Sequence, residues 1–105
     1  MDEIAARIAA EAQNTTQIVE ALLRAGYEIT VDHGENVTVG PSAELSTIVD
    51  ALHACDEETL IATRGGQAAG FVSFVYGNAA NGSEVVADIS ESLEELLAPI
   101  IGRWG

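Results

Sequence analysis

Apolar residues recur every three or four positions along the first part of the chain, and this spacing predicts an amphipathic helix. The stripe is formed by Ile4, Ile8, Ala12, Thr15, Ile18, Val19, Leu22 and Leu23. Asn14 and Gln17 resemble a capping box, which predicts a short helix followed by a main helix over about residues 15–25. Gly26 is expected to cap the end of the main helix.

Alternating apolar and polar residues then predict a β-hairpin. Its strands are "YEITVD" at 27–32 and "VTV" at 37–39, and "HGEN" forms the turn between them. Pro41 and Ser42 are expected to begin a second helix that runs to about Ala54. The buried stripe of this helix would consist of Leu45, Ile48, Val49 and Leu52.

The second half of the chain predicts three more strands and a final helix. "TLIATR" at 59–64 and "AGFVSFVY" at 69–76 flank the tight turn "GGQ", and "EVVADIS" at 84–90 follows the loop "GNAANG". The last segment, "ESLEELLAPIIGRW", has a helical stripe of Leu93, Leu96, Leu97 and Ile100. Pro99 is expected to bend or end this helix.

These elements predict a single α+β domain spanning residues 1–105. Their order along the chain is α-β-β-α-β-β-β-α, and short connections between successive strands favour antiparallel pairing. We therefore expect an antiparallel sheet of about five strands with helices on one face.

The strand at 69–76 is apolar on both of its faces. Phe71 and Val75 point to one side, and Val72 and Phe74 point to the other. Such a strand is typical of the middle of a sheet that is covered by helices on one side and often by a partner on the other. Tyr76 at its end and Asn78 in the following turn are interpreted mainly as structural residues, with a role in a site as the alternative.

Charge is the unusual feature of the composition. The chain has 17 acidic residues against four basic ones, all arginine, and a net charge of −13. Such a charge repels nucleic-acid phosphates and anionic membrane surfaces, so direct binding to either is not expected. Three explanations of the acidity remain: solubility, adaptation to a salty cytoplasm, or attraction of a basic protein partner.

The acidic residues gather in two clusters, Asp56, Glu57 and Glu58 before a strand, and Glu91, Glu94 and Glu95 in the last helix. Like charges at these helical spacings repel one another and destabilise the helix, which is compatible with a selected anionic surface. The two clusters, together with Tyr76 and Asn78, are the predicted partner-binding residues.

No catalytic, cofactor-binding or metal-binding residues are predicted. His53 and Cys55 would point in different directions on a helix, and a metal site needs three or four converging ligands. "TRGGQAAG" lacks the lysine and Ser/Thr of a phosphate-binding loop. The protein is therefore not expected to be an enzyme. The alternative is a small enzyme that uses Tyr76, Asn78 and a carboxylate.

A cytoplasmic location is expected. The N-terminal "MDEIAARIAAEAQ" lacks the basic region and apolar core of a signal peptide, and no apolar run is long enough to span a bilayer. The single cysteine, Cys55, allows no intramolecular disulfide and fits a reducing compartment.

The segment from Asp56 to Ile100 resembles a group of small, poorly characterised proteins encoded by bacteriophages and prophages. The shared features are the acidic "DEETL", a strand ending in "FVYGN", a V-x-D strand and the helical "LEELLAP". This chain departs from the pattern at Ile89, where an aromatic residue is usual. No activity is known for the group, and the resemblance implies a protein that modulates a host or phage machine.

These observations lead to one hypothesis and two alternatives. The hypothesis is a non-enzymatic interaction protein, dimeric through the exposed side of its sheet, that binds a basic protein. In its sharper form it mimics nucleic acid and inhibits a host defence. The alternatives are a structural or assembly protein whose acidity serves only solvation, and the small enzyme described above.

Overall fold

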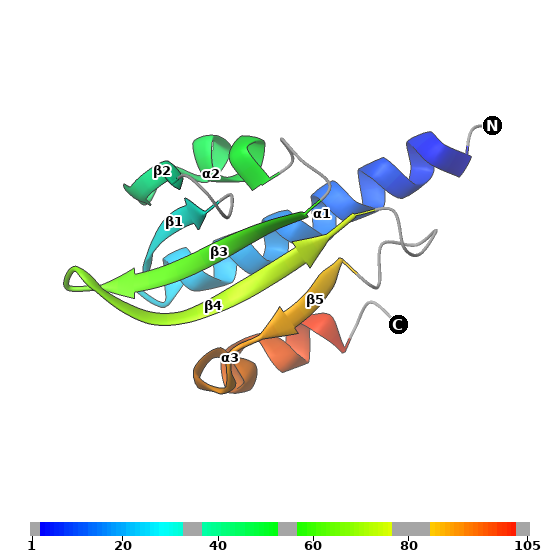
Figure 1. Ribbon diagram of the computed structural model, residues 1–105. Coiled ribbons are helices and arrows are strands. Elements are labelled where there is room, and N and C mark those ends of the chain that lie inside the picture. The colour runs from blue at the N-terminus through cyan, green and yellow to red at the C-terminus, as the bar shows by residue number, and fades with distance from the viewer. Residues whose placement is uncertain (1–2, 33–36, 53–56, 77–84, 103–105) are drawn as a thin grey trace.

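The computed structural model describes residues 3–32, 37–52, 57–76 and 85–102 (Figure 1). These residues form three helices and five strands: α1 (Glu3–Arg24), β1 (Glu28–Asp32), β2 (Val37–Ser42), α2 (Leu45–Leu52), β3 (Glu57–Arg64), β4 (Gln67–Val75), β5 (Val86–Ile89) and α3 (Glu91–Ile101). The predicted α+β class, with an antiparallel sheet and three helices, is confirmed.

The strands form one antiparallel sheet in the order β2-β1-β3-β4-β5. Its centre is the β3–β4 hairpin, in which Ile61 lies opposite Phe71. The turn of this hairpin consists of Gly65 and Gly66, whose φ values of 61° and 82° lie in the left-handed region. Because L side chains rarely adopt this conformation, the double glycine makes the tight turn possible.

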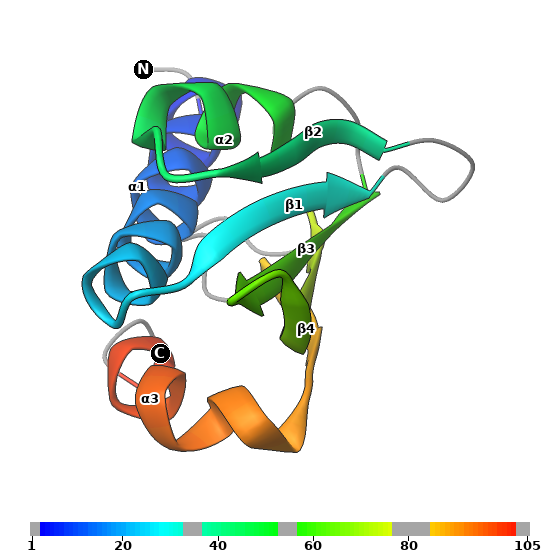
Figure 2. The same cartoon turned by 90° about the vertical axis from the view of Figure 1, so that its left-hand side faces the viewer.

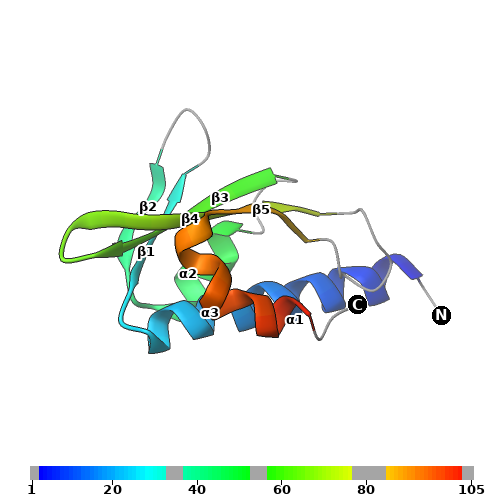
Figure 3. The same ribbon diagram turned by 90° about the horizontal axis from the view of Figure 1, so that it is seen from below.

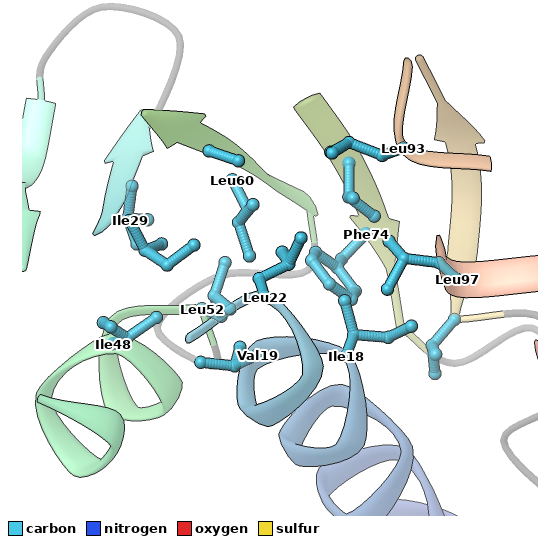
Figure 4. Packing of buried hydrophobic residues seen from close by; sticks show 14 residues of the cluster. Ile18, Val19, Leu22, Ile29, Ile48, Leu52, Leu60, Phe74, Leu93 and Leu97 are labelled. Carbon is cyan, nitrogen blue, oxygen red and sulfur yellow. The ribbon is translucent and has the colours of Figure 1, made fainter. Parts of the chain in front are cut away.

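All three helices pack on the same face of the sheet, as Figures 2 and 3 show. The core between the two layers contains the fully buried side chains of α1, α2, α3 and the inward positions of the strands (Figure 4). The largest of them are Phe74, Ile18, Leu22, Ile29, Ile48, Leu52, Leu60, Leu93 and Leu97. The opposite face of the sheet has no helix of the described chain against it.

The predicted break in the first helix is absent, because α1 is continuous from Glu3 to Arg24. Asn14 is not a cap but a buried residue in the middle of the helix, 8% exposed. Thr16 donates its hydroxyl to the carbonyl of Ala12 at 2.8 Å, a bond that is compatible with an unbroken helix. The predicted cap at Gly26 is confirmed by its φ of 95° and by the bond from its N–H to the Leu23 carbonyl.

The prediction that Pro41 and Ser42 begin the second helix is wrong. Both residues belong to β2, and α2 begins at Leu45. Proline is tolerated in β2 because this is an edge strand, where a missing N–H interrupts no ladder on the open side. Ser42 instead accepts a hydrogen bond from the Glu44 N–H at 3.1 Å, just before the helix. Pro99 does not end α3, which continues to Ile101.

Candidate functional site

The sheet surface opposite the helices is a candidate site, and we call it the open face. Alternation along each strand assigns residues to it, because their neighbours in the chain point into the core. Ile29 and Val31, Leu60 and Ala62, and Val72 and Phe74 are buried. The residues between and beside them form the open face: Glu28, Thr30, Asp32, Glu57, Thr59, Ile61, Phe71, Ser73, Val75 and Asp88.

Three residues of the open face are large and apolar, and we call Ile61, Phe71 and Val75 the apolar strip. Ile61 and Phe71 are direct cross-strand neighbours on β3 and β4, and Val75 lies further along β4. All three side chains are partly exposed and lie opposite the core. Because apolar surface in water is unfavourable, this strip is suited to contact with another molecule.

Acidic side chains lie beside and between these apolar residues, and we call Glu28, Asp32, Glu57 and Asp88 the acidic rim. Asp32 and Asp88 share a row with Thr59 and Ser73, and Glu57 lies opposite Val75. Every ionisable residue that the described chain places on the open face is one of these carboxylates. Arg64, at the end of β3, turns away to α1, where it donates to the Ala25 carbonyl and stacks 4.1 Å from the centre of the Tyr27 ring. The open face therefore attracts cations.

A hollow of about 310 Å³ lies at one end of the open face. It is lined by Asp32, Glu57, Glu58, Thr59, Ser73, Phe74 and Val75. The hydroxyls of Thr59 and Ser73 lie 3.4 Å apart across the two central strands. Carboxylates beside hydroxyls and an apolar wall suit a cationic side chain such as arginine or lysine. Within the described residues, no three His, Cys, Asp or Glu side chains are arranged to hold a metal ion.

A second polar group lies in the interior, where α1 approaches the ends of β3 and β4. This buried polar cluster consists of Glu11 and Thr15 of α1, Glu58 of β3, and Tyr76. The hydroxyls of Thr15 and Tyr76 lie 3.4 Å apart, and the Tyr76 ring stacks on Phe74 with centroids 6.3 Å apart. Tyr76 thus packs against the core, as its structural interpretation predicts.

Burial raises the pKa of Tyr76 from 10.0 to about 12. This pKa also reflects the hydrogen bond to Thr15, which lowers it, and the nearby carboxylates of Glu11 and Glu58, which raise it. The phenol is therefore neutral at physiological pH, so that it can donate a hydrogen bond but does not act as an ionised base.

This pKa leads to a prediction for alkaline pH. Because the folded-state pKa exceeds the unfolded value, the contribution of Tyr76 to stability is complete below pH 10.0 and is lost as the pH rises through about 12. Denaturant unfolding between these limits is expected to show this loss in the wild type and not in Tyr76→Phe. An identical alkaline loss in the variant would contradict the assignment.

The predicted partner-binding residues do not form one surface. Glu57 is exposed on the open face, whereas its neighbour Glu58 is 3% exposed and belongs to the buried polar cluster. Glu91, Glu94 and Glu95 are exposed on α3, which covers the other face of the sheet. The predicted binding residues Asp56 and Asn78 lie outside the described residues, as do His53 and Cys55.

Sequence reasoning missed three members of the acidic rim: Glu28, Asp32 and Asp88. The alternation in "EITVD" already places Glu28 and Asp32 on the face opposite Ile29 and Val31. Only the strand pairing places Asp88 next to Ser73. The alternating pattern of the sequence therefore predicts the positions of Glu28 and Asp32 in β1, whereas the position of Asp88 in β5 requires the structure.

Among the described residues, no helix is both long and apolar enough to cross a membrane. Comparison with known proteins yields no match to any family model, curated protein or solved structure.

Proposed function

We propose that this protein is a small, non-enzymatic interaction protein that binds a basic protein partner through the open face. The observation that carries the proposal is the presence on one sheet face of the apolar residues Ile61, Phe71 and Val75 next to the carboxylates of the acidic rim. Protein interfaces combine apolar contact surface with polar and charged groups that pair with the partner. The resemblance of Asp56–Ile100 to phage-encoded proteins supports the same class of function.

Charge favours a basic partner over a second copy of this chain. A homodimer formed through the open face would bring the acidic rims of two subunits together, and like charges across an interface are unfavourable. A basic partner would pair with the same carboxylates. We therefore propose the heteromeric complex, and keep the homodimer as the competing arrangement that a molar-mass measurement distinguishes.

The sharper form of the proposal is nucleic-acid mimicry, in which the carboxylates take the place of phosphates in a nucleic-acid channel. The net charge of −13 supports it. Such binding depends on ion pairs that salt screens. Affinity for a basic nucleic-acid enzyme that stays unchanged from low to high salt would count against mimicry.

The two alternative functions, an assembly protein and a small enzyme, make different demands on the acidic rim and on Tyr76. If the acidity served only solvation, as in an assembly protein, stability would rise steeply with molar KCl and the rim would not discriminate between ligands. A small enzyme would need a reactive group. The high pKa of Tyr76 supports a structural role for the phenol instead.

A synthetic amphipathic helix with leucine on one side and lysine on the other is a suitable probe for the open face. We expect binding by calorimetry at low salt, and roughly tenfold weaker binding to the variant Glu28→Gln, Asp32→Asn, Glu57→Gln, because three exposed ion pairs are lost. The matched control, Asp50→Asn, Glu91→Gln, Glu95→Gln, removes equal charge from exposed helix positions. Equal weakening in both variants would reduce the effect to net charge and overturn the proposal.

A further inference from the structure

The sheet has two edge strands, β2 and β5, and they differ in their capacity to pair with another strand. β2 contains Pro41, which has no N–H and is a common device against edge pairing. β5, Val86–Ile89, contains neither proline nor glycine. An incoming strand is therefore better accommodated at β5.

The backbone N–H of Ile89 in β5 points to this open edge of the sheet. The Ser90 N–H donates to the Phe71 carbonyl of β4 at 3.0 Å. Because successive residues of a strand alternate in direction, the N–H of Ile89 points away from β4. It donates to its neighbour, the Asp88 carboxylate, at 2.9 Å. A side-chain oxygen thus takes the place that the carbonyl of a further strand would occupy.

An apolar groove adjoins this edge, and we call it the β5–α3 groove. It has a volume of about 310 Å³ and is lined by Ile89, Glu94, Ala98, Ile101 and Gly102. β5 and α3 lie next to each other in Figure 1. A groove between an edge strand and a helix is the arrangement in which several domains bind an extended peptide as an added strand.

The surroundings of the groove are uniformly acidic. From Val86 to Gly102 the chain carries four acids and no basic residue, and the acids are Asp88, Glu91, Glu94 and Glu95. All four side chains are exposed. The charge therefore favours a segment that is rich in arginine or lysine.

We propose that β5 accepts an extended segment of the basic partner as an additional strand of the sheet. A residue opposite Ile89 shares its face, so its side chain enters the β5–α3 groove and should be apolar. The residues on either side share the face of Asp88 and should be basic. The recognised pattern is thus basic-apolar-basic, and Asp88 exchanges its bond to Ile89 for an arginine of the partner. The inference rests on the proposed function only in requiring a basic partner.

The probe for this inference is a short synthetic peptide of alternating arginine and isoleucine. Its control has the same composition with the arginines grouped, so that charge is equal and alternation is lost. We expect the grouped peptide to bind about tenfold more weakly, because its side chains no longer alternate between the two faces. An alternating peptide with an N-methylated backbone should be weakened by a similar factor, because it loses a backbone hydrogen bond. Hydrogen exchange at the Ile89 amide should slow only with the alternating peptide.

Variants of the full chain separate this inference from the proposed function. Ala98→Trp fills the groove and should abolish the preference for the alternating peptide, whereas Ala9→Trp, at an exposed position of α1, should retain it. If the peptides bind equally and Ala98→Trp has no effect, strand addition is wrong. Binding of the leucine-lysine helix to the open face would then still support the proposed function. Failure of all the peptides to bind would overturn both.

Discussion

Replacing Phe74 with alanine is expected to lower the free energy of unfolding by about 3–5 kcal/mol. Phe74 is 1% exposed, and it is the largest fully buried side chain of the described chain. Its ring lies next to Ile18 of α1 and Leu97 of α3 (Figure 4). It also stacks on the ring of Tyr76. Truncation to alanine leaves a cavity, because the close-packed side chains around Phe74 can move only in part to fill it. Urea unfolding followed by circular dichroism measures the loss.

Phe71→Ala is the matched control for this prediction. Phe71 lies on the same strand, three residues earlier, but on the open face, where it is partly exposed. We expect its removal to cost less, about 1–2 kcal/mol, because the side chain is only partly buried and its loss leaves no enclosed cavity. Similar losses at both positions would mean that both faces of β4 are buried in the isolated protein, for instance in a homodimer.

The second large effect is expected for Gly70→Ala. A Cβ at Gly70 would lie 2.6 Å from Ser90 Oγ, 2.7 Å from Leu93 Cγ and 2.7 Å from Ser92 Oγ. Two hydrogen bonds hold the start of α3 at this point of β4. Ser90 Oγ accepts from the Phe71 N–H at 2.9 Å, and the Ser92 hydroxyl donates to the Ala69 carbonyl at 2.7 Å.

An alanine at Gly70 therefore has to displace the side chains of Ser90, Ser92 and Leu93 from the positions that attach α3 to the sheet. Overpacking together with weakened hydrogen bonds is expected to cost about 2–4 kcal/mol of unfolding free energy. Gly40→Ala is the control, because a Cβ at Gly40 in β2 would meet no atom within 4 Å. A melting temperature that falls equally in both variants would contradict the assignment of the effect to the contact with α3, because alanine at an unstrained position is expected to be neutral or stabilising.

Much of the fold followed from periodicity. Helical spacing located α1, α2 and α3, and alternation located the strands, because both patterns record which side of an element is buried. The misses occurred where tertiary structure decides. Asn14 lies in a continuous helix because it is buried against the rest of the domain, and Pro41 fits a strand because that strand is at the edge.

The candidate site was less predictable than the fold. The neighbours Glu57 and Glu58 form one acidic cluster in the sequence, yet they point to opposite faces of β3 because a strand alternates. Asp32 joins Glu57 at the hollow only through the pairing of β1 with β3. The proximity of Glu11, Glu58 and Tyr76 likewise depends on contacts between elements distant in the chain, which local patterns do not contain.

The most direct test of the open face as a binding surface is a nuclear magnetic resonance titration of the labelled protein with the leucine-lysine helix. We expect the amide shifts to concentrate at Thr30, Ile61, Phe71 and Ser73, on the strands that carry the apolar strip and the acidic rim. Shifts confined to α1, α2 and α3, with these strand amides unchanged, would contradict the account and place binding on the helical side of the molecule.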